Sequence, residues 1–498
     1  MTSVLPEQST VRESFESLNP ATDEVVGTHP VHSREDVEAA VSKAHEAAVW
    51  WEALGYAGRA ERLRRWKGVL TRRLAQLAEV VRAETGKPTG DAQLEAVLAI
   101  EHIDWAARNA RKVLGRKHRA PGLLLSNNDA TVEYQPYGVV GVIGPWNYPV
   151  YTPLGSVTYA LAAGNAVVFK PSEYTPGVGQ WLVDTFAEVV PEYPVLQQVT
   201  GFGTTGDALV RSEVNKIAFT GSTATGKKIM AAASERLTPV VIEAGGKDPM
   251  LVDADADLDA AADATVWGAF SNAGQTCIGV ERVYVHERVH DEFVAKVLDK
   301  TKDIRGGADS RAQYGPMTMR SQIEVVRSHI TDALARGGRA LAGGLEAVGD
   351  RCVQPTVLVD VPEESSAVRE ETFGPTVTIA KVRDMEEAIA KANDTVYGLG
   401  STVFSHSRGT EIARRLRTGA TAINAPLAFA GIASLPFGGV GDSGFGRIHG
   451  PEGLREFARP KAIARQRFPA PLALTSFTRS DKTEQLVSKA MAILHGRK

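Results

Sequence analysis

The stretch GVVGVIGPWNYPVYTPLGSVTYALAAGNAVVFK, residues 138–170, decides the fold class. Two short apolar runs, residues 139–144 and 165–170, predict buried strands, and residues 152–163 between them predict a helix. The span 134–169 contains no Asp, Glu, Lys or Arg, so its length alone would fit a membrane helix. Its four prolines and several glycines argue against that interpretation. We predict strand, loop, helix and strand in a buried α/β core, and no integral membrane span.

The alternation of strand and helix patterns continues toward the C-terminus in two blocks, the second of which starts near Pro249. Continuous apolar strands that alternate with helices indicate parallel sheets with both faces covered, so the fold class is α/β. In such sheets ligands bind beside the carboxyl ends of the strands. The further predicted strands are 195–199, 216–220, 282–286, 376–380 and 401–404, and the further predicted helices are 177–190, 225–236, 258–273 and 289–303.

The regions that flank this pattern have a different character. Residues about 123–137 and 462–468 predict a small projecting β unit. The later half of the tail predicts a helix, for which docking on the same subunit is favoured over partner contact or weak membrane contact. Amphipathic, Ala-rich segments near the N-terminus predict a helical cover exposed to solvent: 33–50, 57–84 and 93–113.

Composition places the chain among ordinary globular proteins, with 23% charged and 43% hydrophobic residues in a length of 498. That length predicts two or three domains. A net charge of −3, with no basic run, argues against nucleic acid as a partner. Two cysteines cannot build a disulfide framework, and the N-terminal residues do not resemble a secretory signal, so we predict a cytoplasmic protein. No metal site is indicated.

Cys277 follows the small, polar segment NAGQT, residues 272–276, in a predicted loop between a helix and a strand. A lone cysteine is ordinarily a small buried hydrophobe, but this segment is poor material for a packed core. Glu243 lies 34 residues earlier in the Gly-rich junction between the two α/β blocks, where clefts form. A thiol and a carboxylate in such positions indicate covalent catalysis with a general base.

The segment FTGSTATG, residues 219–226, follows a predicted strand and opens a predicted helix. Gly221 lets the backbone approach a ligand, and Ser222 adds a hydroxyl to the free N–H groups of the helix N-terminus. This combination favours a phosphate group, although an ordinary helix cap is the alternative interpretation. The GxGxxG and Walker patterns are both absent here.

Lys170 ends a buried strand in the segment FKPSE, residues 169–173. A cation at this edge of a sheet can bind ribose hydroxyls or phosphate. Glu173 can accept a hydrogen bond from a ribose 2′-OH and would repel a 2′-phosphate. The pair therefore favours NAD, with NADP left open. The alternative is a surface ion pair worth about 0–1 kcal/mol.

Together these motifs resemble those of the aldehyde dehydrogenase superfamily, in the family's order and with its Glu-to-Cys spacing, from about residue 15 to about residue 465. The further matching motifs are PWNYP at 145–149, EETFGP at 370–375 and PFGG at 436–439. The resemblance implies oxidation of an aldehyde to the carboxylic acid, through a cysteine thiohemiacetal and thioester, with hydride transfer to NAD. The CoA-acylating relatives fit less well, because this chain keeps the base that activates water.

By the same resemblance, Cys277 is the nucleophile, Glu243 the general base and Asn147 the side-chain half of the oxyanion hole. The cofactor-binding residues that it implies are Trp146, Lys170, Glu173, Gly203, Gly221, Ser222, Glu371 and Phe373. Aromatic candidates for the wall of a substrate tunnel, each of which alone also suits a packed core, are Tyr148, Tyr151, Phe270 and Phe437, with Trp267 and Phe429.

The resemblance also implies a domain organisation. A Rossmann-like NAD-binding domain takes residues 1–121 and 138–246, an α/β catalytic domain takes 247–435, and an oligomerisation β unit takes 122–137 and 460–470. Residues 436–459 return to the interface of the first two domains, and 471–498 form a C-terminal tail. The β unit implies a homodimer or a homotetramer. The segment RIHG, residues 447–450, is more similar to the dimeric branch that takes aromatic and fatty aldehydes, which leaves oligomeric state and substrate open.

The predicted substrate is an apolar or aromatic aldehyde, because aromatic side chains dominate the tunnel candidates. Arg282 sits at a structural position of the family motif and no other arginine is indicated for an acidic substrate, so succinic semialdehyde ranks lower. Betaine aldehyde and amino-aldehydes are further alternatives. A catalytically silent binding paralogue is a competing class, although the chain keeps both Cys277 and Glu243, and an esterase that uses the same thiol is a third.

Overall fold

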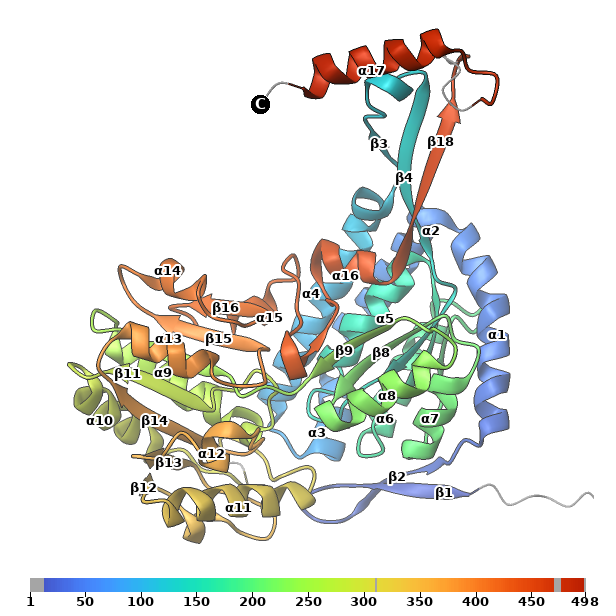
Figure 1. Ribbon diagram of the computed structural model, residues 1–498. Helices are drawn as coiled ribbons and strands as arrows, with labels where there is room; N and C mark the ends of the chain where they lie inside the picture. The colour runs from blue at the N-terminus through green and yellow to red at the C-terminus, as the bar shows by residue number, and fades with distance from the viewer. Residues whose placement is uncertain (1–12, 310, 470–475, 497–498) are drawn as a thin grey trace, which may run out of the picture. The chain divides into compact units, whose positions relative to one another are not determined.

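The computed structural model describes residues 13–309, 311–469 and 476–496 (Figure 1). By the density of contacts the chain divides into two compact units: Met1–Val113 with Pro136–Ala458, and Leu114–Gln135 with Arg459–Lys498. Over the described residues, no helix combines the length and the apolar character that crossing a bilayer requires.

The first unit contains a six-stranded sheet in the order β17-β9-β8-β5-β6-β7. Neighbouring strands are parallel except for β17, which runs antiparallel to β9. The strands are β5 Val139–Ile143, β6 Ala166–Lys170, β7 Leu196–Gln198, β8 Lys216–Gly221, β9 Val240–Ala244 and β17 Gly444–Phe445. The helices beside them are α1 Arg34–Ala53, α5 Tyr151–Ala163, α6 Pro176–Ala187, α7 Gly203–Arg211 and α8 Thr223–Ser234.

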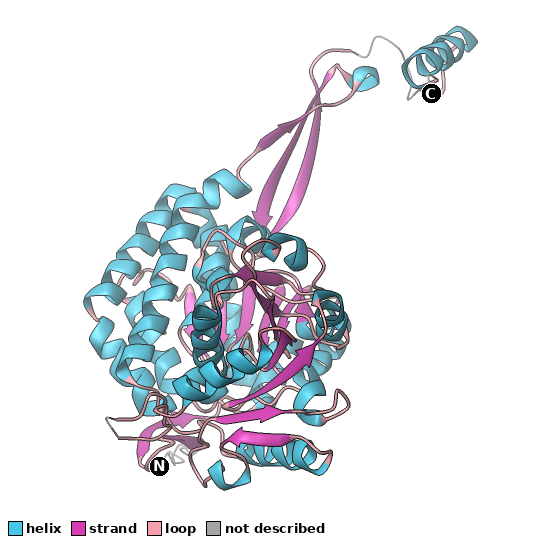
Figure 2. Cartoon of the chain, turned by 90° about the vertical axis from the view of Figure 1, so that its left-hand side faces the viewer, coloured by secondary structure: helices cyan, strands magenta, loops and turns pink. Residues whose placement is uncertain are grey.

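A seven-stranded sheet in the same unit has the order β12-β13-β14-β11-β10-β15-β16, parallel except between β12 and β13. Its strands are β10 Pro249–Val252, β11 Arg282–His286, β12 Arg339–Ala342, β13 Thr356–Val359, β14 Thr376–Val382, β15 Gly400–Phe404 and β16 Ala420–Ile423. Its longer helices are α9 Leu258–Phe270, α10 His290–Thr301, α11 Ser321–Ala335 and α13 Met385–Asn393. The two mainly parallel sheets of the first unit confirm the predicted α/β fold class. Figure 2 shows helices flanking the strands.

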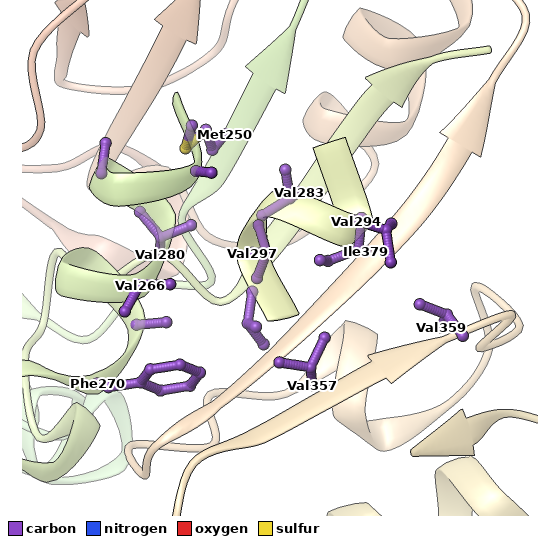
Figure 3. Packing of buried hydrophobic residues seen from close by; sticks show 14 of the residues in the cluster. Met250, Val266, Phe270, Val280, Val283, Val294, Val297, Val357, Val359 and Ile379 are labelled. Atoms are coloured by element: carbon purple, nitrogen blue, oxygen red, sulfur yellow. The ribbon is translucent and has the colours of Figure 1, made fainter. Parts of the chain in front are cut away.

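The core of the second sheet lies between its strands and the helices α9 and α10 (Figure 3). Val266 of α9 and Val297 of α10 pack in one cluster with Val283 of β11 and Ile379 of β14, all of them buried. Burying an aliphatic side chain of this size contributes roughly 1.5–3 kcal/mol to folding. This packing fixes the end of α9, after which the chain turns toward Cys277.

The N-terminal region departs from the predictions in two places. The segment predicted as helical from 57 to 84 is divided into α2 Gly55–Arg72 and α3 Leu74–Thr85, because Arg73 leaves helical geometry at φ −109° and ψ 23°. A hairpin of β1 Ser14–Leu18 and β2 Val25–Pro30 was not predicted, since its mostly exposed strands show no clear alternation of apolar and polar residues. The third predicted helical segment, 93–113, lies within α4 Thr89–Leu114.

Short elements complete the first unit: α12 Ser366–Arg369, α14 Gly409–Ala413, α15 Ala428–Gly431, α16 Gly450–Glu456, and the 3₁₀ turns η2 Ser271–Gly274, η3 Leu345–Ala347 and η4 Gly441–Ser443.

The second unit is built on a three-stranded sheet in the order β18-β4-β3. Its strands are β3 Lys117–Arg119, β4 Asn128–Pro136 and β18 Ala458–Gln466, and α17 Asp481–His495 lies in the tail. The segment 123–137 is not strand throughout, because Leu123–Leu125 form the 3₁₀ turn η1 before β4 begins. Leu486 and Leu494 of α17 are exposed, and residues 470–475 lie outside the described part of the tail.

The junction of the two sheets positions the site. The chain leaves β9 at Ala244 and enters β10 at Pro249 only five residues later. The carboxyl edge of the six-stranded sheet is therefore joined directly to the amino edge of the seven-stranded sheet. Glu243 lies near the carboxyl end of β9 in the six-stranded sheet, and Cys277 lies just before the amino end of β11 in the seven-stranded sheet.

Candidate active site

A cavity at this junction is lined by both the Cys277 thiol and the Glu243 carboxyl. Its volume is about 220 Å³, and most of its wall is apolar. Tyr148, Tyr151 and Phe437, three of the predicted tunnel residues, line it as well. The structure thus brings the predicted nucleophile, the predicted base and an aromatic wall into one enclosed space.

The loop that presents Cys277 has an unusual backbone. After α9 ends, Asn272, Ala273 and Gly274 all have left-handed φ angles, of 52°, 57° and 69°. A Cβ at Gly274 would lie 2.1 Å from the carbonyl oxygen of Gly374, so glycine is required by space as well as by φ. Gln275 anchors the loop, because its Oε1 accepts a hydrogen bond of 2.9 Å from the backbone N–H of Thr318.

Glu243 is almost fully buried, with 3% of its surface exposed. Neither carboxyl oxygen accepts a hydrogen bond of ordinary geometry from the described residues. Burial raises the pKa of this carboxyl from 4.5 to about 7, although the nearby Cys277 thiol and Thr220 hydroxyl lower it in part. Such a carboxyl exchanges its proton near neutral pH, as a general base must.

Burial also raises the pKa of the Cys277 thiol, and the neighbouring carboxylate of Glu243 raises it further. The resting sulfur is therefore a thiol rather than a thiolate at neutral pH. The thiolate is the reactive form of a cysteine, so a reaction at this sulfur would require a proton acceptor, and the Glu243 carboxyl is close enough to affect the pKa of the thiol.

Asn147 lies on the loop after β5 and is buried. Its Nδ2 donates a hydrogen bond of 2.9 Å to the carbonyl oxygen of Gln275, two residues before Cys277. An amide nitrogen carries two hydrogens, so one remains for another acceptor. The same loop is tied to the cysteine loop a second time, because the hydroxyls of Tyr148 and Thr276 are 2.9 Å apart.

The predicted cofactor residues gather at the carboxyl edge of the six-stranded sheet. Lys170 is buried at the end of β6, its Nζ donates to the Pro171 carbonyl, and burial lowers its pKa. Glu173 follows three residues later and accepts from the Ser172 hydroxyl. A Cβ placed on Gly206 of α7 would lie 3.5 Å from Cδ of Lys170, which brings the helix that starts at Gly203 next to this lysine.

Ser222 caps α8, since its Oγ accepts a hydrogen bond of 3.3 Å from the backbone N–H of Thr225. Gly221 ends β8 directly before it. The ring of Trp146 packs edge-on against Phe373, with ring centroids 5.5 Å apart, and its centroid lies 6.3 Å from that of the Tyr174 ring. Trp146 therefore contacts both Tyr174, which follows β6, and Phe373, which precedes β14.

Glu371 lies over the glycine junction between the sheets. Its Oε1 accepts a hydrogen bond of 3.2 Å from the Gly246 N–H, and a Cβ on Gly245 would fall 2.1 Å from its Oε2. Burial raises the pKa of Glu371 to about 8, with the Glu281 carboxylate the next largest cause. Glu281 itself holds the loop that carries Glu371, by accepting from the Thr372 and Phe373 N–H groups and pairing with Lys247.

Two aromatic predictions are placed elsewhere. Phe270 ends α9 and is 1% exposed in the core cluster of the seven-stranded sheet, so it is not part of the cavity wall (Figure 3). Phe429 is buried behind Phe437, with ring centroids 6.2 Å apart. Arg282 is structural, as expected, because its guanidinium donates to the backbone carbonyls of Lys247 and Ala392.

Sequence reasoning missed one wall of the cavity. The segment 93–113 was predicted to be a helical cover exposed to solvent, but the first turns of α4 line the cavity with Asp91, Leu94, Glu95 and Leu98. Lys87, just before α4, lines it too. The spacing of these four α4 residues, which places them on one helical face, was a signal that could have found this wall.

The site combines a buried thiol and a buried carboxyl in one cavity beside a parallel α/β sheet. The model of the aldehyde dehydrogenase family matches residues 6–463, and the chain belongs to that family. The predicted class, an NAD(P)-dependent aldehyde dehydrogenase, is confirmed at the level of the family.

Individual relatives differ in the aldehyde that they are named for. A 4,4'-diapolycopene aldehyde oxidase of Methylomonas sp is 39% identical over 448 residues, which is 89% of this chain and 84% of the relative. The solved structure of an NAD-dependent aldehyde dehydrogenase from Sinorhizobium meliloti has a TM-score of 0.88 at 34% identity, covering 92% of this chain and 93% of that one. A succinate-semialdehyde dehydrogenase structure from Burkholderia pseudomallei gives 0.86 at 33%, covering 91% and 95%.

Proposed function

We propose that this enzyme oxidises an apolar aldehyde to the carboxylic acid with NAD, through a thioester on Cys277. The observation that carries the proposal is the cavity itself: an apolar wall closes around a protonated thiol and a carboxyl whose pKa is near 7. A carbonyl carbon that enters this space meets a sulfur nucleophile and its proton acceptor together.

The residues of the six-stranded sheet fit a dinucleotide. The exposed N-terminus of α8, capped by Ser222, suits the pyrophosphate, and Lys170 with Glu173 suits the adenosine ribose. The Glu371 carboxyl packs against the Gly245–Gly246 backbone, and it suits the second ribose as a hydrogen-bonding partner. When bound, NAD supplies the hydride acceptor.

Glu243 takes the proton of the Cys277 thiol, and the sulfur attacks the carbonyl carbon. The oxyanion that forms accepts hydrogen bonds from the second Nδ2 hydrogen of Asn147 and from the Cys277 backbone N–H. One such donor is typically worth about 10²–10³ in rate. After hydride loss leaves the thioester, Glu243 releases the first proton to solvent and then deprotonates a water molecule, which attacks the thioester carbon. The acid leaves, and the Cys277 sulfur takes its proton back from Glu243, which restores the thiol.

The charges in the cavity support an apolar substrate. No arginine lines it, and Lys87, the one lysine in its described wall, is paired with Glu95 at 2.7 Å. The other charged groups of the wall are carboxyls, those of Asp91 and Glu243. A substrate carboxylate would therefore be buried without a free cation, which is unfavourable. This argues against succinic semialdehyde.

Asp91 supports a second candidate, a betaine aldehyde or an amino-aldehyde. Its carboxyl lines the cavity, and burial raises its pKa. A cationic substrate would restore the ionised form by pairing with it. We rank this candidate second because the aromatic and aliphatic wall extends to the half-exposed side chains Leu94 and Trp267, 48% and 45% exposed, which suit a continuous apolar tail.

A panel of aldehydes tests the substrate proposal. Hexanal, decanal, benzaldehyde, succinic semialdehyde, betaine aldehyde and 4-aminobutanal are each mixed with enzyme and NAD or NADP, and NADH or NADPH absorbance is followed. The highest kcat/KM is expected for an apolar aldehyde with NAD. A highest value for the carboxy-aldehyde or for a cationic aldehyde overturns the proposal.

We also propose a homodimer or homotetramer that forms through the second unit, in the cytoplasm. β18 is an edge strand of its sheet and is exposed along almost its whole length, and exposed edges favour pairing with another chain. The two cysteines are free thiols, which fits a reducing compartment. Light scattering after size-exclusion chromatography tests the assembly, and a monomer contradicts it.

A further inference from the structure

A buried ion pair in the wall of the cavity contacts the loop that carries Asn147. Nζ of Lys87 is 2.7 Å from Oε2 of Glu95, and the two side chains are 1% and 0% exposed. Desolvating two charges so completely is costly, and removing one partner of a buried pair is more so, so such a pair is weak support for stability alone. The hydrogen bonds that Lys87 and Glu95 make to other groups indicate a further role for the pair.

Lys87 connects the pair to the backbone of Asn147. The ammonium donates a second hydrogen bond, of 2.8 Å, to the Asn147 carbonyl oxygen. The amide of Asn272 in the cysteine loop donates to the same oxygen at 3.1 Å. Lys87 also lies 4.3 Å from the centre of the Tyr148 ring, one residue further along the loop.

Glu95 holds the other end of the same loop. Its Oε1 accepts hydrogen bonds from the backbone N–H groups of Val150, at 2.7 Å, and Tyr151, at 3.1 Å. These are the first groups of α5, where a carboxylate is favoured by the helix dipole. The pair thus holds the loop at the Asn147 carbonyl and again at the start of α5.

We propose that Lys87 and Glu95 are positioning residues that fix the oxyanion donor of Asn147 relative to Cys277. With the Asn147 carbonyl and the start of α5 both held, the amide is aimed at the Gln275 carbonyl beside the cysteine. Neither charged residue needs to touch the aldehyde for this role. The inference rests on the proposed function, in which Asn147 stabilises the oxyanion.

A double-mutant cycle between Glu95 and Asn147 tests the inference. Glu95→Gln keeps the size of the side chain and an oxygen for Val150 and Tyr151, but it breaks the link to Lys87. We expect kcat/KM to fall about 10²-fold for every aldehyde alike, as for a misplacement of about 1 Å. Asn147→Ala is expected to fall about 10²–10³-fold. Because Glu95 acts through Asn147, the double variant should lie within about threefold of Asn147→Ala alone.

Two further measurements separate positioning from loss of structure. KM for NAD and the rate of Cys277 alkylation by iodoacetamide should stay within about twofold of wild type, since neither depends on the oxyanion donor. Glu456→Gln is the matched control, because it removes the partner of another buried lysine, Lys216, at 2.8 Å, outside the cavity wall. If Glu95→Gln does not fold, Lys87→Met with Glu95→Gln leaves no unpaired charge and is expected to show the same loss.

Independent losses that multiply in the double variant overturn the inference, as does a kcat/KM of Glu95→Gln within about threefold of wild type. Full activity of Asn147→Ala would instead exclude Asn147 from the proposed mechanism. The positioning role of Lys87 and Glu95 would then be excluded as well.

Discussion

The two sheets of the first unit contribute to the site in opposite ways. The six-stranded sheet supplies residues that follow its strands: Asn147 after β5, Lys170 at the end of β6 and Ser222 after β8. The seven-stranded sheet supplies residues that precede its strands: Cys277 before β11 and Glu371 before β14.

The rule that ligands bind at the carboxyl ends of parallel strands therefore describes only one of the two sheets. The other sheet presents its amino edge, because the chain passes from β9 to β10 without a crossover helix. The regular edge carries Glu243 and most of the groups suited to NAD, and the other edge carries Cys277, on its strained loop, together with Glu371. Substitutions on one sheet at a time can separate the contribution of the six-stranded sheet from that of the seven-stranded sheet.

The largest effect is expected at the sulfur, on the side of the seven-stranded sheet. Cys277→Ala should lower NADH formation by roughly 10⁴-fold or more, since no other described group of the cavity can form the thioester. NAD binding, measured by calorimetry, should be unchanged, because Cys277 is not among the residues proposed to hold the dinucleotide. Cys352→Ala, the change of the second cysteine, is the control and should keep full activity. Turnover retained by Cys277→Ala would refute covalent catalysis at this position.

The next effect concerns Glu243, at the end of β9. A carboxyl acts as a base only when it is ionised, and its pKa is raised from 4.5 to about 7. At one pH unit below that value only about a tenth is ionised, so kcat/KM should rise with pH through about 7 and then level. Glu243→Gln should lose about 10²–10⁴-fold and should lack this rise. The pH–rate profile of both proteins checks this; an unchanged rise in the variant contradicts the role.

A smaller effect is expected from the six-stranded sheet alone. Glu173→Ser should improve the use of NADP relative to NAD by about tenfold, because it removes a carboxylate that would repel a 2′-phosphate. The ratio of kcat/KM values for the two cofactors measures the change, and Glu188→Ser, a surface change after α6, is the control. An equal ratio in Glu173→Ser and wild type counts against this carboxylate as the discriminator.

The smallest effect is expected at the mouth of the cavity. Trp267→Ala should lower kcat/KM for decanal by about three- to tenfold and leave propanal unchanged, because only a long tail reaches this half-exposed ring. The series of straight-chain aldehydes from three to ten carbons provides the measurement. A loss that is equal for short and long chains would place the ring nearer the reacting carbon than we propose.

Much of the fold could be predicted from the sequence, because buried parallel strands are apolar runs that need no long-range information. β5, β6 and β11 were found in this way within a residue or two. Cys277 and Glu243 could be predicted to lie close together because segments at a sheet junction meet in space, and both side chains line one cavity in the structure. Their catalytic roles, which the family resemblance implies, stay predictions.

The rest depended on packing that local sequence does not encode. Lys87 and Glu95 are charged residues of a kind that is almost always exposed, and only the fold brings them together in the interior. Phe270 and Phe437 are equally aromatic in sequence, yet the last turn of α9 turns one into the core while the other reaches the cavity. The break between α2 and α3 at Arg73 likewise follows from backbone geometry that the amphipathic pattern does not reveal.

The left-handed run Asn272–Ala273–Gly274 has a consequence for how each turnover begins. Non-glycine residues adopt such angles only when their surroundings enforce them. Here the amide of Asn272 donates to the Asn147 carbonyl of the neighbouring loop and to the Gln275 carbonyl of its own loop. The path of the backbone that leads to Cys277 is thus set while the chain folds, which reduces the conformational freedom that remains before attack on the carbonyl. A variant with a relaxed loop would keep its fold and its ligands but would reach the reactive alignment in only a fraction of encounters.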